Sequence, residues 1–167
     1  MNGVYEMTEN IGWTTGFWTG MLWLAYQFSG DEKYRVAALG HVRDFYNRIE
    51  QRIDTDHHDM GFLYSLSCAA AYKITGDETA KRAAVMAADQ LCERFQDKGQ
   101  FIQAWGPMGQ DVNYRLIIDC LMNIPLLFWA EKVTGNHEHR RIAEAHLKTA
   151  VYWSLRICAT LRKRSCS

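Results

Sequence analysis

Residues 74–77 read Ile-Thr-Gly-Asp, and near-copies of this stretch occur at 28–31 (Phe-Ser-Gly-Asp) and at 133–136 (Val-Thr-Gly-Asn). Each glycine follows a long apolar segment and therefore fits the position just after a helix. Glycine takes the positive φ of that position at little cost because it has no Cβ. The three stretches therefore predict three helical hairpins, each of which turns at its glycine.

The segments on either side of these hinges alternate in character. We expect nearly uncharged helices over about 14–29, 61–75 and 114–134, and amphipathic helices over about 31–53, 77–95 and 137–152. This order predicts inner helices that are covered nearly all round and outer helices that are covered on one face. The fold class is all-α. A helical toroid and an open α-solenoid would give similar patterns, and polar loops gathered at one end favour the toroid.

One interruption breaks this alternation. Residues 97–113 contain four Gly or Pro positions and predict a long loop, with a short extended piece at 101–103.

Composition excludes several classes of function. Apolar residues make up 48% of the chain and charged residues 23%, and the 19 basic and 19 acidic residues give a net charge of zero. Nothing suggests a nucleic-acid partner. Residues 11–28 carry no charge, but their threonines and glycines dilute the hydropathy, so we expect a buried helix and no membrane span. The glycines of this segment would let a neighbouring helix approach closely.

The cysteines and the start of the chain bear on its location. The cysteine count of five is odd and includes no Cys-x-x-Cys pair, which favours reduced thiols in a cytosol. The first residues lack a basic and apolar leader pattern. We therefore expect a cytoplasmic protein.

Three chemistry-bearing side chains share one position in the repeat. Trp13 and Asp59 each lie 17 residues before their hinge glycine, and Asp119 lies 16 residues before its own. If each segment is one repeat of a helical array, these groups emerge near the same end of neighbouring inner helices. Two carboxylates and an indole at one mouth indicate a carbohydrate site.

Asp119 is the strongest candidate for catalysis. It lies in an otherwise apolar run that we expect to be helical, where a carboxylate must be paired or protonated. A carboxyl group whose pKa is raised by burial can donate a proton near neutral pH. The structural alternative is an Asp119 bonded to backbone amides or to Arg115 on the same helical face. Asp59 stands at the start of a predicted helix, where an N-cap role is compatible with a functional one.

The tryptophans fall into two groups. Trp105 lies in the glycine-rich loop, and with Trp13 it is a candidate platform for a sugar ring. The tryptophans that fall inside predicted helices are expected to belong to the core: Trp18, Trp23 and Trp129.

The histidines do not predict a metal site. The cluster at 56–59 has contiguous potential ligands and no partner cluster, which is a weak metal signal. We expect His137, His139 and His146 to be solvated, and we expect no metal or cofactor.

Three motifs together resemble the bacterial unsaturated glucuronyl hydrolases, over about residues 9–150. They are Asn-Ile-Gly-Trp-Thr-Thr-Gly-Phe-Trp at 10–18, His-His-Asp-Met-Gly-Phe at 57–62, and the segment 119–123. Unsaturated rhamnogalacturonyl hydrolases are a more distant resemblance. The resemblance implies an (α/α)6 toroid, of which residues 1–150 would supply about three of six hairpins. Residues 151–167 then read as a divergent basic tail of the kind that a shifted reading frame produces.

The resemblance also implies a chemistry. The substrate would carry a 4,5-unsaturated uronic acid left by polysaccharide lyases acting on glycosaminoglycans, and hydration of its C4=C5 bond would release the next sugar. Asp119 would act as acid and base, Asp59 would hold the ring hydroxyls, and His58, Trp13 and Trp105 would line the pocket.

Two further expectations follow from the apparent half-length. A half-toroid is expected to be weakly active or inactive alone and to self-associate through exposed inner helices. The alternative function is a non-catalytic fragment that binds a glycan or a peptide at the same mouth.

Overall fold

The computed structural model describes residues 8–164, with side chains through residue 156. Its first two hairpins are formed by α1 (Thr15–Ser29) with α2 (Glu32–Glu50), and by the π-helix η1 (Gly61–Ala69) continuing into α3 (Ala70–Thr75) with α4 (Glu78–Cys92). The third pairs α5 (Pro125–Thr134) with α6 (His137–Arg164). Short elements connect the second hairpin to the third: β1 (Phe95–Gln96), β2 (Phe101–Ile102), and the 3₁₀ turns η2 (Asp111–Asn113) and η3 (Cys120–Met122).

The three predicted hinges are confirmed, and they share one hydrogen-bond pattern. Gly30, Gly76 and Gly135 adopt positive φ angles of 68°, 73° and 74°. The hydroxyl before each glycine donates to the carbonyl four residues back and accepts the N–H of the residue after the glycine. That next residue is Asp or Asn, and its side chain accepts an N–H from the first turn of the following helix. The hinge sequence therefore ends one helix and caps the next.

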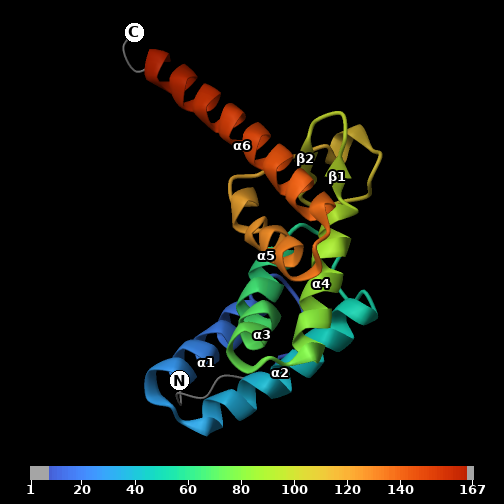
Figure 1. The fold of residues 1–167 in the computed structure, drawn as a ribbon. Coiled ribbons are helices and arrows are strands. Elements are labelled where there is room, and N and C mark those ends of the chain that lie inside the picture. Colours follow the sequence, from blue (N-terminus) through green and yellow to red (C-terminus); the bar gives the residue numbers. More distant parts are fainter. Residues whose placement is uncertain (1–7, 165–167) are drawn as a thin grey trace.

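The helices form an inner and an outer layer, as the alternation predicts. α1, the η1–α3 segment and α5 lie side by side on one layer, while α2 packs on α4, and α6 packs on α5 (Figure 1). Close approach between inner helices depends on Gly16, because a Cβ there would lie 2.2 Å from the carbonyl oxygen of Phe62. The core between the layers is built around Phe45, Leu63, Leu91 and Leu127, with many small alanines on α4.

Several element boundaries differ from the predictions. The segment 61–75 is helical, but its first nine residues form a π-helix, which the hydrophobic pattern does not reveal. The helix expected to end near 152 continues to Arg164, so the tail expected from residue 151 is helical over its described part. The short extended piece expected at 101–103 is present as β2, which pairs antiparallel with β1.

The expectation of a helix covered nearly all round does not hold for α1 in this chain, whereas the expectation of exposed inner helices does. α1 packs on η1 and α2, but it leaves one apolar face exposed: Phe17, Trp18, Met21, Leu24 and Phe28. Trp18 is 57% exposed, so its assignment to the core is also wrong, whereas Trp23 is buried and Trp129 is half-buried against Tyr72. The exposed face marks an open edge of the helical array.

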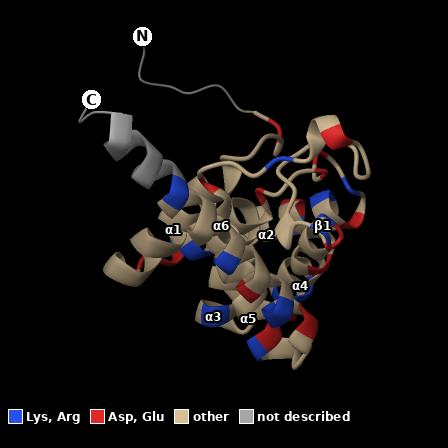
Figure 2. Ribbon diagram, turned by 90° about the horizontal axis from the view of Figure 1, so that it is seen from above, with Lys and Arg blue, Asp and Glu red and all other residues tan. Residues whose placement is uncertain are grey.

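Two expectations from composition can be compared with the described residues. No described helix is long and apolar enough to cross a membrane. Basic and acidic positions are interspersed around the molecule in the view of Figure 2, as the zero net charge suggests. Cys68, Cys92 and Cys120 are free thiols, whereas the side chains of Cys158 and Cys166 lie outside the described residues.

Candidate active site

The loop that carries Asp59 pairs with the segment at Ala104, which in turn pairs with the segment at Arg115. His58 donates its backbone N–H to the carbonyl of Ala104 (2.8 Å), and Ala104 in turn donates to the carbonyl of Arg115 (3.1 Å). His57 and Trp105 form an isolated antiparallel bridge next to these bonds. Segments separated by up to about a third of the chain are thus joined at the mouth of the inner helices.

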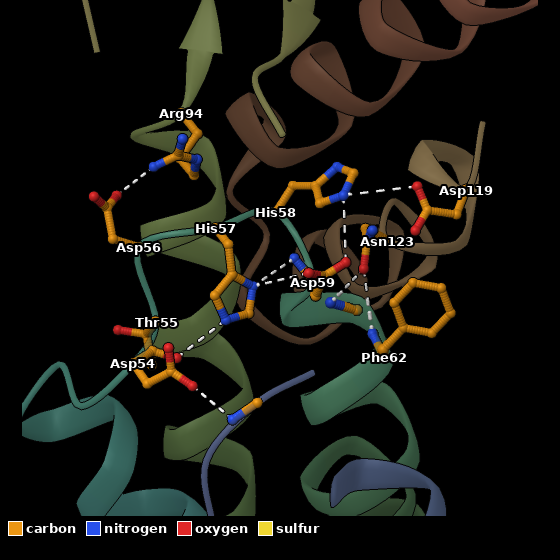
Figure 3. Close-up of polar contacts among 12 residues, drawn as sticks. Asp54, Thr55, Asp56, His57, His58, Asp59, Phe62, Arg94, Asp119 and Asn123 are labelled. Atoms are coloured by element: carbon orange, nitrogen blue, oxygen red, sulfur yellow. Dashed lines mark hydrogen bonds and ion pairs between the residues drawn. The ribbon is translucent and has the colours of Figure 1, made fainter. Parts of the chain in front are cut away.

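Asp59, His58 and Asp119 meet at this mouth (Figure 3). His58 Nε2 lies 3.3 Å from Asp59 Oδ1 and 3.7 Å from Asp119 Oδ1. One ligating atom from each of the three residues lies within 4.8 Å of the other two. The expectation that the two aspartates emerge near each other is therefore confirmed by geometry.

Burial governs the electrostatics of His58. Its side chain is 2% exposed, whereas Asp59 is 15% and Asp119 35% exposed. Desolvation lowers the pKa of His58 below its ordinary value, and the charges of Asp59 and Asp119 oppose that shift. The imidazole is therefore a neutral hydrogen-bonding group beside two carboxylates near neutral pH.

Two atoms of this cluster are left without partners. Within the described part of the chain, His58 Nε2 and Asp119 Oδ1 are buried and form no hydrogen bond of good geometry. Buried polar atoms are nearly always hydrogen-bonded in folded proteins. Each of these two atoms therefore has an unused capacity for one hydrogen bond.

The prediction that residues 114–134 form one helix is wrong, and Asp119 is not on a helix. It lies in a turn that leads into η3, and α5 begins only at Pro125. Proline has no N–H to donate to the preceding turn, so a continuous helix cannot run through this position without losing a bond. The argument from a carboxylate buried in an apolar helix therefore does not apply.

The side chain of Asn123 fixes the Asp119 turn in place. Its Oδ1 accepts hydrogen bonds from the backbone N–H groups of Gly61 (3.1 Å) and Phe62 (3.3 Å), at the start of η1. The two backbones touch here, since a Cβ on Gly61 would lie 2.3 Å from the Cα of Asn123. This contact joins the turn that carries Asp119 to the helix that follows Asp59.

The two tryptophans predicted to be sugar platforms are exposed, and they belong to two different segments that contact the Asp59 loop. Trp13 is 51% exposed and stands edge-to-face against Phe62, at 5.6 Å between ring centroids. Trp105 is 42% exposed, and the guanidinium of Arg115 lies 5.2 Å from its ring. Trp13 is thus connected to the site through Phe62, and Trp105 through its bridge to His57.

The histidines of α6 correct another expectation. His137 is exposed, but His139 and His146 are buried, so the expectation that they are solvated is wrong. His139 Nε2 lies 2.7 Å from Asp89 Oδ1, and His146 Nδ1 accepts the backbone N–H of Ile102 at 2.9 Å. Each histidine joins α6 to a neighbouring element, which a single sequence cannot show.

Two other features bear on ligands. The cluster of His58, Asp59 and Asp119 is the set of described residues that could hold a metal ion, and it coincides with the carbohydrate site proposed from sequence. A cavity of about 180 Å³ lies on another side of the loop, lined by Thr55, Asp56, Gln90 and Arg94 among others. The three clustered residues do not line it, so the cavity is separate from this chemistry.

Sequence reasoning missed two buried arginines, Arg48 and Arg94. Each has a side chain no more than 3% exposed and bonds to the loop before Asp59. One signal for Arg48 was its position: it falls three residues after Phe45 on the apolar face of α2, where a charge needs a buried partner.

Three helical hairpins with two carboxylates and a histidine at the mouth of the inner layer define part of an α/α toroid. The chain matches the family model Glycosyl Hydrolase Family 88 over residues 2–152, and it belongs to this family.

Its relatives are enzymes of one kind. It is 53% identical over 145 residues to an unsaturated chondroitin disaccharide hydrolase of Streptococcus agalactiae, a match that covers 87% of this chain and 36% of that protein. The crystal structure of the unsaturated glucuronyl hydrolase from Streptococcus agalactiae has a TM-score of 0.86 at 51% identity and covers 90% of this chain and 38% of that one. A mutant of that enzyme complexed with dGlcA-GalNAc6S has a TM-score of 0.72 at 44% identity, over 88% of this chain and 34% of that one. The chain therefore spans a little over a third of the length of these relatives.

Proposed function

We propose that this chain carries catalytic groups of a hydrolase for lyase-generated oligosaccharides that end in a 4,5-unsaturated uronic acid. The observation that carries the proposal is the cluster of His58, Asp59 and Asp119, with unpartnered buried atoms on two of the three residues. The relative solved with dGlcA-GalNAc6S supports a glycosaminoglycan-derived disaccharide as the substrate class.

The geometry supports a hydration reaction. Asp119 is more exposed than its two neighbours and would reach a bound sugar, where it donates a proton to C4. The resulting carboxylate then accepts a proton from the water that attacks C5. The product is a hemiketal, which opens and releases the neighbouring sugar as an alcohol. Because the glycosidic oxygen is not displaced directly, the spacing rule for ordinary glycosidases does not apply.

Asp59 and His58 have supporting roles in this proposal. Asp59 donates its backbone N–H to His57 Nδ1, its carboxylate lies 3.3 Å from His58 Nε2, and it would accept hydrogen bonds from ring hydroxyls. Neutral His58 would bond to the same ring, since its Nε2 faces both carboxylates. The exposed indoles of Trp13 and Trp105 offer apolar faces to the CH groups of the sugar.

The remaining expectations are proposals about the protein in solution. We expect the 167-residue chain to have weak turnover or none, because it supplies only part of the toroid and leaves one face of α1 uncovered. The same face would drive self-association. The free thiols of the described residues fit a reducing cytoplasm.

A chimera tests the catalytic proposal without depending on the activity of the chain alone. Residues 9–150 would replace the corresponding segment of the Streptococcus agalactiae hydrolase, which is 53% identical in this region. We expect loss of the ultraviolet absorbance of the conjugated double bond when the chimera is given an unsaturated chondroitin disaccharide. A folded chimera that binds the disaccharide without turnover would instead favour the non-catalytic glycan-binding alternative. A chimera that turns over only an unsaturated rhamnogalacturonan product would move the substrate class to that family.

A further inference from the structure

Two buried arginines contact the loop before Asp59, and each also bonds to a different neighbouring loop. Arg48 projects from α2 and Arg94 lies just after α4, and both are 2% exposed. Burying a guanidinium is costly unless its N–H groups are satisfied. Most of the acceptors of these two arginines are backbone carbonyls of loops, so each arginine acts as a connector between loops more than as half of an ion pair.

Arg48 joins the Trp13 loop to the start of the Asp59 loop. Its Nη2 donates to the carbonyls of Gly12 (2.9 Å) and Asp54 (2.7 Å), and its Nη1 donates to Asn10 Oδ1 (3.2 Å) and Thr15 Oγ1 (3.2 Å). Gly12 closes the contact by donating its N–H to Asp54 Oδ2 at 2.6 Å. The residues on both sides of Trp13 are therefore bonded to Arg48 or to its partner.

Arg94 makes the matching connection on the other side. It donates to the carbonyls of Gln103 (3.0 Å) and Gly106 (2.9 Å), which flank Trp105, and it is paired with the Asp56 carboxylate (Figure 3). The amide of Gln103 adds bonds to the carbonyls of Trp105 (3.0 Å) and Gly106 (2.9 Å). Arg94 therefore joins the Trp105 loop to the Asp59 loop at Asp56. Arg48 joins the Trp13 loop to the same loop at Asp54, two residues earlier.

Backbone strain supports a positioning function for this loop. Asp54 has a φ of 47° although it is not glycine. A residue in this left-handed region persists only where surrounding contacts determine it, and such residues gather at functional sites. Here the contacts are those from Arg48 and Gly12.

We infer that Arg48 and Arg94 are paired positioning residues that set where the indoles of Trp13 and Trp105 stand relative to Asp59, and thereby determine the sugar rings that the mouth accepts. Neither arginine contacts the sugar. The substrate-binding part of this inference rests on the proposed function, whereas the positioning part does not.

Amide hydrogen exchange on the 167-residue chain tests the positioning part by a crossover, in which each arginine variant loosens its own loop and leaves the other loop unchanged. Arg48→Lys keeps the charge and loses the branched contact, so exchange should rise about tenfold or more in residues 10–15 and stay unchanged in 103–106. Arg94→Lys should give the reverse. A rise in both segments with either variant would mean general destabilisation, and no rise in either segment would mean that the contacts of Arg48 and Arg94 do not hold the loops. Both results would overturn the inference.

A second pair of variants covers the case in which a lysine variant does not fold. Asp54 and Asp56 have side chains that are 48% and 81% exposed. Asp54→Asn and Asp56→Asn therefore weaken the ion pairs with Arg48 and Arg94 without disturbing the core. They should reproduce the same crossover more weakly.

Binding then tests the specificity part. Unsaturated chondroitin disaccharide would be titrated against the chain by tryptophan fluorescence at a temperature where each variant is folded, and each arginine variant should bind about tenfold more weakly than the unaltered chain. Unchanged affinity in variants that show the crossover would overturn the specificity role. If the unaltered chain does not bind the disaccharide, the same titration is made on the chimera that carries residues 9–150; a chimera that does not bind would contradict the proposed function, while the exchange result still decides the positioning role.

Discussion

His58 Nε2 lies 3.7 Å from Asp119 Oδ1, and neither atom has a hydrogen-bond partner among the described residues. The two groups come from different hairpins, and the bonds from Asn123 to the start of η1 bring them together. A buried imidazole therefore lies beside a partly exposed carboxylate, and each of the two groups has an unused capacity for one hydrogen bond.

Asp119→Asn should abolish turnover in the chimera while sparing sugar binding. The amide has nearly the same shape but cannot pass a proton, so kcat should fall by about 10²–10⁴ or more. Disaccharide affinity, measured by fluorescence, should change little. The matched control is Asp44→Asn on the exposed surface of α2, which should leave both quantities unchanged. A variant at Asp119 that retains most of its turnover would remove this residue from the mechanism.

His146→Gln should flatten the dependence of stability on pH. Burial lowers the pKa of His146 from 6.5 to about 4, so between these values the unfolded chain binds a proton that the folded chain does not. The free energy of unfolding therefore falls as pH drops through this window, by at most about 3 kcal/mol from this one group. Urea unfolding at about pH 7 and about pH 4.5 would measure the difference. The exposed Val36 provides the control, because Val36→Gln removes no titratable group and should leave the pH dependence as it was. Parallel curves for the His146 variant and the unaltered chain would refute the assignment.

Gly61→Ala and Gly40→Ala should have opposite effects. A Cβ on Gly61 would lie 2.3 Å from the backbone of Asn123, so we expect a loss of about 1–3 kcal/mol and displacement of the Asp119 turn. A Cβ on Gly40 would meet nothing within 4 Å on the exposed face of α2, and alanine there should stabilise the chain by about 0.5–1 kcal/mol. Denaturant unfolding of both variants checks the pair. Equal effects of the two substitutions would show that the contact between Gly61 and Asn123 does not matter.

Local signals were sufficient for the hairpins and for the pairing of the aspartates. Each hinge glycine takes the conformation that its neighbours indicated, because the hydroxyl before it and the Asp or Asn after it act within a few residues. The nearly equal spacing from hinge to Asp59 and to Asp119 indicated that the two carboxylates lie near each other for the same reason: neighbouring repeats place equivalent positions side by side.

Contacts between distant segments were not predictable. The turn at Asp119 depends on Asn123 docking against Gly61, and the buried state of His146 depends on β2, so neither leaves a pattern within its own segment. The contacts of Arg48 and Arg94 were missed for the same reason, because their acceptors include carbonyls of loops that lie elsewhere in the chain. The exposed face of Trp18 depends on what covers α1, and the periodicity of α1 alone cannot show that.

Substitutions on α1 should separate self-association from folding. Met21 is 53% and Leu24 is 67% exposed, and neither belongs to the core, so Met21→Gln with Leu24→Gln should leave the unfolding midpoint nearly unchanged. Removing two exposed apolar side chains should weaken association by about 1–3 kcal/mol, or roughly five- to a hundredfold in the dissociation constant. Sedimentation velocity over a range of concentrations would measure it. Val36→Gln on α2, which is 62% exposed, is the matched control and should not alter association. If both variants associate as the unaltered chain does, the open face of α1 is not the contact surface.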